Sequence, residues 1–326
     1  MNKVMCIGWF VLLAGTITGQ SLVLTWPDPS TMPARAGERG LADAGVTFIT
    51  QGQDSHTRVR QWNINGSWRI HHTAQDWLSV VLDLRQEQIG SLFQSQQLVI
   101  GSAYRRQLGQ PHGLFRHSIG AGFQAGFFQM DLQEDQWLFS SQFDNAHYHF
   151  DPTIDSQEEF TGRWNTNLQP VVHAGLYYQG TMGSLTCSFV PSVSMLNAPV
   201  LEMDGWKYSV PSQLQLLTQL EYRINRQWVA GTAWWYTRLT PISESQIQLF
   251  IRLGNQEPGE TTVQLGGFLG VNRDPDQLQL MHGGIHAQVQ WSRHQVGLRV
   301  EDSWARINRW GTRILLQYRY VIPQER

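Results

Sequence analysis

The sequence is poor in charge and in long apolar runs. Charged residues make up 15% of its 326 residues, whereas about a quarter is usual in soluble domains. Lysine and arginine number 24 against 26 aspartate and glutamate, a formal net charge of −2, so neither a basic nucleic-acid-binding surface nor an acidic arm is indicated. Beyond the N-terminus there is no run of about eighteen consecutive apolar residues, which excludes a transmembrane helix there.

Catalytic and cofactor-binding motifs are also missing. The sequence contains no G-x-S-x-G, H-E-x-x-H or C-x-x-C motif and no phosphate-binding loop. His282 and Ser292 are residue types that an outer-membrane lipase uses, but no group that would orient them is identifiable. We therefore expect a protein that is not an enzyme and that has no catalytic residue, no metal and no cofactor.

The first twenty residues differ from the rest of the chain. Lys3 precedes an apolar stretch from Val4 to Gly15, and small residues follow it, as in a secretory signal peptide cleaved near Gly19 or Gln20. A membrane anchor is the alternative, but the apolar stretch is short for a span. With residues 1–20 removed as the signal peptide, the exported chain keeps one of its 2 cysteines and forms no intramolecular disulfide.

Apolar and polar residues alternate along most of the remaining chain, and helical periodicity is nearly absent. In "GGIHAQVQWS" one face carries Ile285, Ala287, Val289 and Trp291, and the other carries His286, Gln288 and Gln290. In the last such segment Leu316 falls on the apolar face. This period of two predicts strands with one apolar and one polar face.

The stretch "HSIGAGFQAGFFQMDL", residues 117–132, contains glycines spaced as in a dinucleotide-binding fingerprint. That fingerprint requires the glycines in a turn between a strand and a helix. Here Ile119, Phe123 and Phe127 alternate with the glycines, and no helical period follows. We therefore expect the glycines in the middle of a strand, on its small or polar face.

About fourteen strands are expected, with starts near Ala44, Val59, Trp77, Gln94, Gly113, Thr166, Ser184, Ser209, Gln227, Ser243, Glu260, Leu278, Gln295 and Asn308. Their length of about 10 to 14 residues suits a tilted bilayer crossing. Aromatic residues gather near the strand ends, and longer and shorter connections tend to alternate, as in outer-membrane barrels.

The fold class expected is therefore all-β: a transmembrane antiparallel β-barrel of about fourteen strands in the outer membrane. It spans residues 44–322, follows a periplasmic N-terminal segment of residues 21–43, and has both termini in the periplasm. A secreted β-sandwich is the alternative, because its strands would alternate in the same way.

Several stretches resemble the PorP/SprF family of outer-membrane proteins from the type IX secretion and gliding apparatus of Bacteroidota. "MPARAGERG", residues 32–40, resembles the family's "NPAYAG" opening, with Met32 and Arg35 in place of Asn and Tyr. "LRQEQIG", "GAGFQAGFFQMDL" with "SSQFDNAHYHFDP", "SFVPSVSML" and "WGTRILLQYRYVI" resemble further strands and loops of that family.

The resemblance implies a non-enzymatic component of type IX protein secretion. Its expected partners are outer-membrane lipid, periplasmic ring components including a lipoprotein, and the C-terminal domain of a secreted protein held at the cell surface. A passive, porin-like diffusion channel and a simple assembly scaffold are the alternatives.

The longest connection, roughly residues 131–162, is too apolar to extend freely into water. We expect it to dock a secreted partner or to plug the barrel mouth, and packing against the rim is the alternative. The candidate partner-binding residues are Trp137, Phe139, Phe143, Asp144, His147, Tyr148, His149, Phe150 and Asp151. The two histidines and two aspartates of this set are residue types that bind metals, but we favour the alternative interpretation, a solvated polar loop.

Arginines also fall on the polar strand faces. The inward set comprises Arg69, Arg85, Arg252, Arg299, Arg313 and Arg319, facing Asp83, Glu221 and Glu301. These charges predict a lumen filled by compensating ion pairs and glutamine hydrogen bonds, with a channel lining as the alternative.

Overall fold

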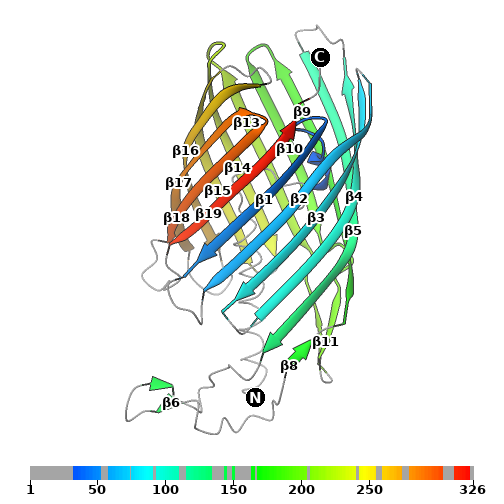
Figure 1. Cartoon of the computed structure of the whole chain (residues 1–326), viewed down its shortest axis with the longest axis vertical. Helices are drawn as coiled ribbons and strands as arrows, with labels where there is room; N and C mark the ends of the chain where they lie inside the picture. Colours follow the sequence, from blue (N-terminus) through cyan, green and yellow to red (C-terminus); the bar gives the residue numbers. More distant parts are fainter. Residues whose placement is uncertain are drawn as a thin grey trace.

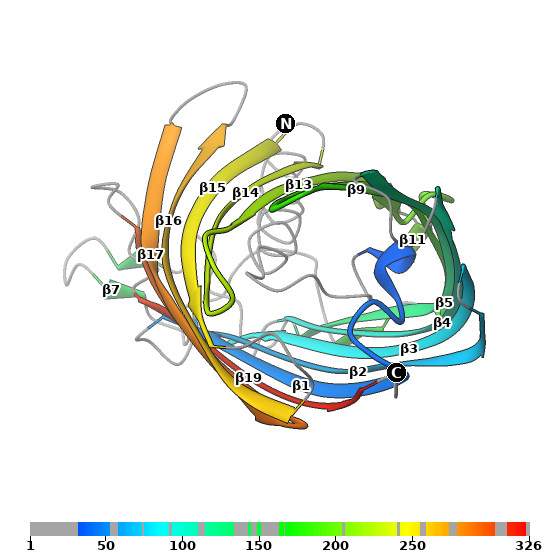
Figure 2. The same ribbon diagram turned by 90° about the horizontal axis from the view of Figure 1, so that it is seen from above.

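The computed structural model describes residues 32–52, 58–73, 75–90, 93–109, 115–133, 143–144, 149–150, 163–165, 167–203, 206–239, 242–254, 259–273, 279–303 and 312–323. The chain forms one closed antiparallel β-barrel of 14 strands (Figures 1 and 2). These are β1 (Ala42–Gln51), β2 (Val59–His72), β3 (Asp76–Ile89), β4 (Phe93–Leu108), β5 (Phe115–Gln133), β9 (Gln169–Met182), β10 (Leu185–Ser194), β13 (Gln213–Arg223), β14 (Trp228–Leu239), β15 (Ile242–Leu253), β16 (Gly259–Arg273), β17 (Gln279–Ser292), β18 (His294–Ser303) and β19 (Arg313–Ile322).

Each wall strand pairs with the next wall strand along the chain, and β1 closes the barrel on β19. This closing register runs from Ala42 opposite Ile322 to Gln51 opposite Arg313. Closure leaves the wall without an open edge, so its backbone groups are satisfied within the sheet, as a lipid environment requires.

Five short strands lie outside the wall positions. β8 (Arg163–Asn165) pairs with the end of β5, β6 (Phe143–Asp144) pairs with β7 (His149–Phe150), and β11 (Val200–Met203) pairs with β12 (Trp206–Ser209). Among the residues that the structure describes, no helix has the length and apolar character to cross a membrane.

The two faces of the wall differ as the alternation predicts. Outward side chains are large and apolar, and Ile285 is 69% exposed on the isolated chain. Inward side chains are mostly polar and buried, and Gln288 is 7% exposed. The predicted positions of Val289 and Leu316 on the apolar outer face are confirmed.

The two barrel ends differ in the length of their connections. At one end, which we call the turn end, the wall strands are joined by residues 73–75, 109–114, 183–184, 224–227, 254–258 and 293. At the other, the loop end, they are joined by residues 52–58, 90–92, 134–168, 195–212, 240–241, 274–278 and 304–312. β1 begins and β19 ends at the turn end, which lies toward the top of Figure 1. In outer-membrane barrels the end with short turns faces the periplasm.

The predicted fold class is confirmed, and the predicted strand starts are close to those observed. The largest difference is in the last strand, predicted to start at Asn308 and observed to start at Arg313. The barrel begins at Ala42 and not at Ala44. The expected signal peptide lies outside the described residues, as do residues 21–31 of the expected periplasmic segment.

Candidate functional site

The described part of the expected periplasmic segment lies inside the barrel. We call residues 32–41 the lumenal segment. It contains a 3-10 turn, η1 (Pro33–Arg35), with proline at its start. Figure 2 shows this blue stretch within the ring of strands. Met32 is 0% and Ala34 1% exposed, so the described part of this segment is packed as an interior element of the barrel.

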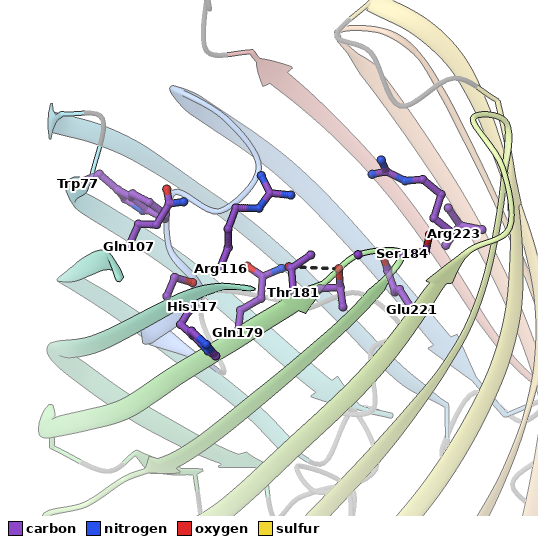
Figure 3. A pocket seen from close by; sticks show the side chains of 13 residues that line it. Trp77, Gln107, Arg116, His117, Gln179, Thr181, Ser184, Glu221 and Arg223 are labelled. Carbon is purple, nitrogen blue, oxygen red and sulfur yellow. Dashed lines mark hydrogen bonds between the residues drawn. The ribbon is translucent and has the colours of Figure 1, made fainter. Parts of the chain in front are cut away.

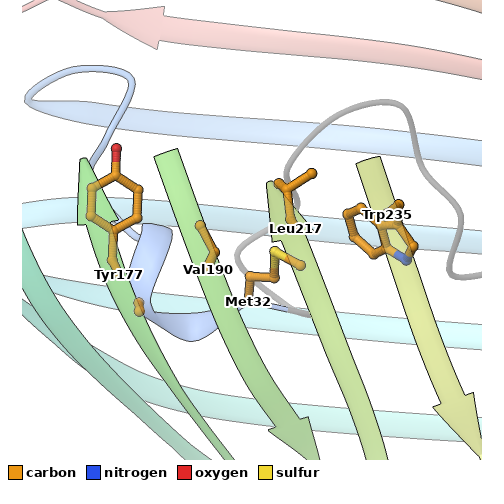
Figure 4. Packing of buried hydrophobic residues seen from close by; sticks show 6 residues of the cluster. Met32, Tyr177, Val190, Leu217 and Trp235 are labelled. Atoms are coloured by element: carbon orange, nitrogen blue, oxygen red, sulfur yellow. The ribbon is translucent and has the colours of Figure 1, made fainter. Parts of the chain in front are cut away.

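Apolar contacts hold the lumenal segment to one side of the wall. Met32 and Ala34 pack in one buried cluster with Tyr177, Val190, Leu217 and Trp235. Figure 4 shows that the four wall residues project from neighbouring strands β9, β10, β13 and β14. Burying apolar side chains here contributes about 25 cal/mol per Å² removed from water, which favours docking of the segment.

The segment also contacts the neighbouring strands β2, β3 and β4. Ala36 packs with Val81 of β3 and Ala103 of β4 in a second buried cluster. The Gly37 nitrogen donates a 3.0 Å hydrogen bond to Ser67 Oγ, and Gly37 O accepts one of 2.6 Å from Arg69 Nε. The lumenal segment therefore lies along the inside of the wall and contacts consecutive strands from β2 to β14.

Glycine makes room for this close approach. A Cβ atom added at Gly122 would lie 2.4 Å from Ala34 N and 2.4 Å from the carbonyl carbon of Pro33. Both are backbone atoms, so neither can rotate away. Gly122 belongs to the glycine-rich strand β5, whose glycines face inward as predicted, and this position is where the lumenal segment crosses the wall.

A polar cluster centres on Glu38. Its carboxylate lies 2.5 Å from Arg35 Nε and 3.9 Å from Arg105 Nη1, and it accepts a 2.8 Å hydrogen bond from Tyr177 Oη. The Arg105 guanidinium lies 3.5 Å from the centre of the Tyr177 ring, a cation–π geometry. Burial alone would raise the pKa of Glu38, but Arg35 and Arg105 and the hydrogen bonds from Arg35 and Tyr177 lower this pKa from 4.5 to about 2. Glu38 is therefore ionised at neutral pH.

Ion pairs fill much of the remaining lumen. Arg299 Nη2 and Arg313 Nη1 lie 3.1 and 3.3 Å from Glu301 Oε2. Arg252 Nη2 lies 3.0 Å from Glu221 Oε1. Further pairs join Arg319 to Asp43 and His282 to Glu301. The predicted compensation of inward arginines is confirmed for Arg252, Arg299, Arg313 and Arg319.

The predicted partner-binding residues fall in the connection between β5 and β9. Of these, the structure describes the backbone of Phe143, Asp144, His149 and Phe150, which pair as β6 and β7. The others, Trp137, Phe139, His147, Tyr148 and Asp151, lie outside the described residues. The residues that the structure does describe hold no group of three or more metal-ligating side chains.

The sequence offers residues 26–40 only as a second candidate docking segment, in the periplasm, and does not place the lumenal segment inside the barrel. Its signal was present: "MPARAG" has small residues where a packed segment needs them, and β5 has glycines on its inward face. Only the three-dimensional pairing shows that these two stretches meet.

Comparison with known proteins gives a family. No curated protein matches the chain. The chain is similar to the CymD monoaromatic hydrocarbon channel at 8% identity and a TM-score of 0.47, over 87% of this chain and 89% of that one. It is similar to Acinetobacter baumannii Omp33 at 8% identity and 0.45, over 88% and 100%, and to the Ralstonia pickettii toluene transporter TbuX at 9% and 0.43, over 90% and 92%.

The family model described as type IX secretion system membrane protein PorP/SprF matches residues 30–230. This range includes "MPARAGERG" and every other stretch quoted for the resemblance except "WGTRILLQYRYVI". The match begins just before the lumenal segment and covers β2, β3, β4, β5, β9, β10 and β13, which contact it. The chain therefore belongs to the PorP/SprF family of type IX secretion system membrane proteins and forms an outer-membrane barrel.

Proposed function

We propose that this barrel serves type IX secretion as a closed docking component. It acts together with periplasmic ring components at its turn end, and it holds the C-terminal domain of a secreted protein at its loop end. It works without catalysis and without a cofactor. Its barrel supplies a fixed position in the outer membrane, and its ends supply the binding surfaces.

The observation that carries this proposal is that the lumenal segment packs inside the barrel. A diffusion channel of this size needs a continuous water-filled path. Here Met32 and Ala34 pack on β9, β10, β13 and β14, Ala36 packs on β3 and β4, and Glu38 contacts Arg105 and Tyr177. These contacts favour a docking role over passive conduction.

Conductance separates docking from the porin-like alternative. The purified full chain is inserted into a planar bilayer, and the current is recorded at steady voltage. A closed component gives no steady current. A steady open current in the unaltered protein would show that solutes pass and would overturn the closed-barrel proposal.

The loop end is tested by deletion. We expect removal of Phe143–Asp151 to release a co-expressed secreted partner from the cell surface while the barrel still inserts. The matched control removes the hairpin Val200–Ser209 from the same end, and this variant should retain the partner. Retention after the first deletion would remove that connection as the docking surface.

A further inference from the structure

A second feature of the lumen is a cavity of about 380 Å³ at the turn end. Inward side chains of β5 and β9 line it, and Figure 3 shows Arg116, Gln179 and Thr181 close together on these two neighbouring strands. Arg116 and Ser184 of its lining are exposed, so the cavity opens to solvent. Because the turn end faces the periplasm in outer-membrane barrels, small periplasmic solutes have access to it.

Four of the lining residues form a compact group, which we call the donor patch: Arg116, Ser118, Gln179 and Thr181. The strand register places Arg116 opposite Thr181, and Ser118 opposite Gln179. Cβ atoms of directly opposite residues are about 4.5–5.5 Å apart, and residues two apart on one strand are about 6.6 Å apart on the same face. One small ligand therefore lies within reach of all four side chains.

A buried polar atom in the donor patch points to a ligand. Ser118 is 8% exposed, and its Oγ has no hydrogen-bond partner within the described part of the chain. A buried hydroxyl without a partner is costly, and a ligand oxygen would accept its hydrogen bond.

The other members of the donor patch also have hydrogen-bond donors left over. The side-chain oxygen of Gln179 accepts a 3.1 Å bond from Tyr177 Oη, so its NH₂ group remains to donate. Thr181 and Thr186 share one hydrogen bond of 3.3 Å between their hydroxyls, which uses one of the two hydrogens. Among the residues that the structure describes, the side chain of Arg116 makes no ion pair and no hydrogen bond.

Two carboxylates near the donor patch are already paired. Glu221 lines the far side of the cavity, on β13, and lies 3.0 Å from Arg252. Two strands, β9 and β10, separate β13 from β5. Glu38 lies 2.5 Å from Arg35. The donor patch thus combines a positive charge with an excess of donors, which suits an anion with acceptor oxygens, whereas a cation would require acceptors.

We propose that the donor patch binds one small oxyanion, a phosphate or carboxylate group of a periplasmic solute. Arg116 supplies the charge, and its planar guanidinium binds either group through two parallel hydrogen bonds. Ser118, Gln179 and Thr181 donate hydrogen bonds to the remaining oxygens. The inference makes no use of the proposed docking function, so each stands or fails separately.

The test measures phosphorus NMR line broadening of inorganic phosphate by the full mature barrel in detergent, with ionic strength held constant by sodium chloride. We expect saturable broadening. Arg116→Gln should weaken phosphate binding about tenfold, and Ser118→Ala about threefold to tenfold. Arg226→Gln is the matched control, because it removes the same charge at the same end but lies outside the cavity lining, and it should change little.

Isotope-labelled acetate, measured in the same way, distinguishes the two ligand groups. Tighter binding of acetate assigns the site to carboxylates, and tighter binding of phosphate assigns it to phosphates. Ser118→Ala removes a hydroxyl that has no partner in the described chain, so its folding should be intact, and the heat-dependent gel shift checks this for each variant.

Three results would overturn the inference. The first is that neither phosphate nor acetate binds in a saturable way. The second is unchanged affinity in Arg116→Gln or in Ser118→Ala. The third is a loss in Arg226→Gln as large as that in Arg116→Gln, which would indicate unspecific attraction of anions to the barrel mouth.

Discussion

Tyr177 Oη donates a 2.8 Å hydrogen bond to Glu38 Oε1, although the two residues are 139 positions apart. The bond joins the lumenal segment to β9, and Arg105 of β4 contacts both partners. The segment at the start of the described chain can reach this arrangement only when β4 and β9 are in place. Docking of the lumenal segment is therefore coupled to completing the wall.

Loss of the Tyr177 hydroxyl should loosen this connection. Tyr177→Phe keeps the ring beneath Arg105 but removes the donor to Glu38, and we expect it to lower the free energy of unfolding by about 1 kcal/mol. Thermal unfolding followed by the heat-dependent gel shift measures the change. Tyr178→Phe is the control, because that hydroxyl contacts His117 on the exposed outer face and should contribute about 0.5 kcal/mol or less. Equal effects would mean that the Tyr177–Glu38 bond adds nothing particular.

The pH dependence of how firmly the lumenal segment packs in the barrel should follow the titration of Glu38. Its pKa is lowered to about 2 in the folded chain from 4.5, so its stabilising contribution is fully present above the unfolded value. That contribution is lost as the pH falls from 4.5 toward 2. Between pH 5 and 8 we expect no change in the stabilising contribution of Glu38 to the packing of the lumenal segment. Glu38→Gln should be less stable at pH 7 and should lack the decline below pH 4.5, and a decline of the same size in this variant would assign it to another group.

Gly122 should be essential for seating the lumenal segment. Gly122→Val places side-chain atoms against the backbone of Pro33 and Ala34, so we expect the segment to be displaced and a current to appear in planar bilayers. Gly267→Val is the matched control in β16, because a Cβ there meets only Gly284 O at 3.6 Å, an ordinary contact. If the Gly122→Val barrel inserts normally and carries no current, groups other than the lumenal segment close the lumen.

The two faces of the barrel wall should differ in how far they tolerate charge. Val289→Arg and Leu316→Arg place a guanidinium in the apolar outer face and should cost about 2–4 kcal/mol near the bilayer midplane. Gln288→Arg faces the lumen and should cost much less. Folding free energies measured in lipid vesicles test this difference, and equal costs at Val289 and Gln288 would contradict the membrane-facing assignment.

The barrel was predictable because each strand carries its own signal. In β17 and β19 apolar and polar residues alternate, so each strand and its two faces can be predicted from the local sequence. The structure was needed only to fix where the strands begin and end. The predicted start of the last strand, Asn308, lies outside the described residues, and β19 is described from Arg313.

The lumenal site was not predictable in the same way, because its signal is divided between distant segments. "MPARAG" has no periodicity, and the prolines before and within it indicate a stretch that is neither strand nor helix. Gly122 was correctly placed on the small inward face, but nothing local identifies Pro33 and Ala34 as the atoms it accommodates. Tyr177 is one of the aromatic residues that the sequence analysis placed near strand ends. In the structure its side chain points into the lumen and donates a hydrogen bond to Glu38.

The central claim is that the lumenal segment occupies the barrel interior in the folded protein. Its most direct test is the reaction of Ala34→Cys, in a Cys187→Ser background, with a water-soluble maleimide added to the folded barrel in detergent. Ala34 is 1% exposed, so the account predicts almost no labelling until the protein is heated, while an Arg226→Cys control in the exposed turn labels at once. Rapid labelling of Ala34→Cys in a fully folded barrel would show that the segment lies outside the lumen and would contradict the account.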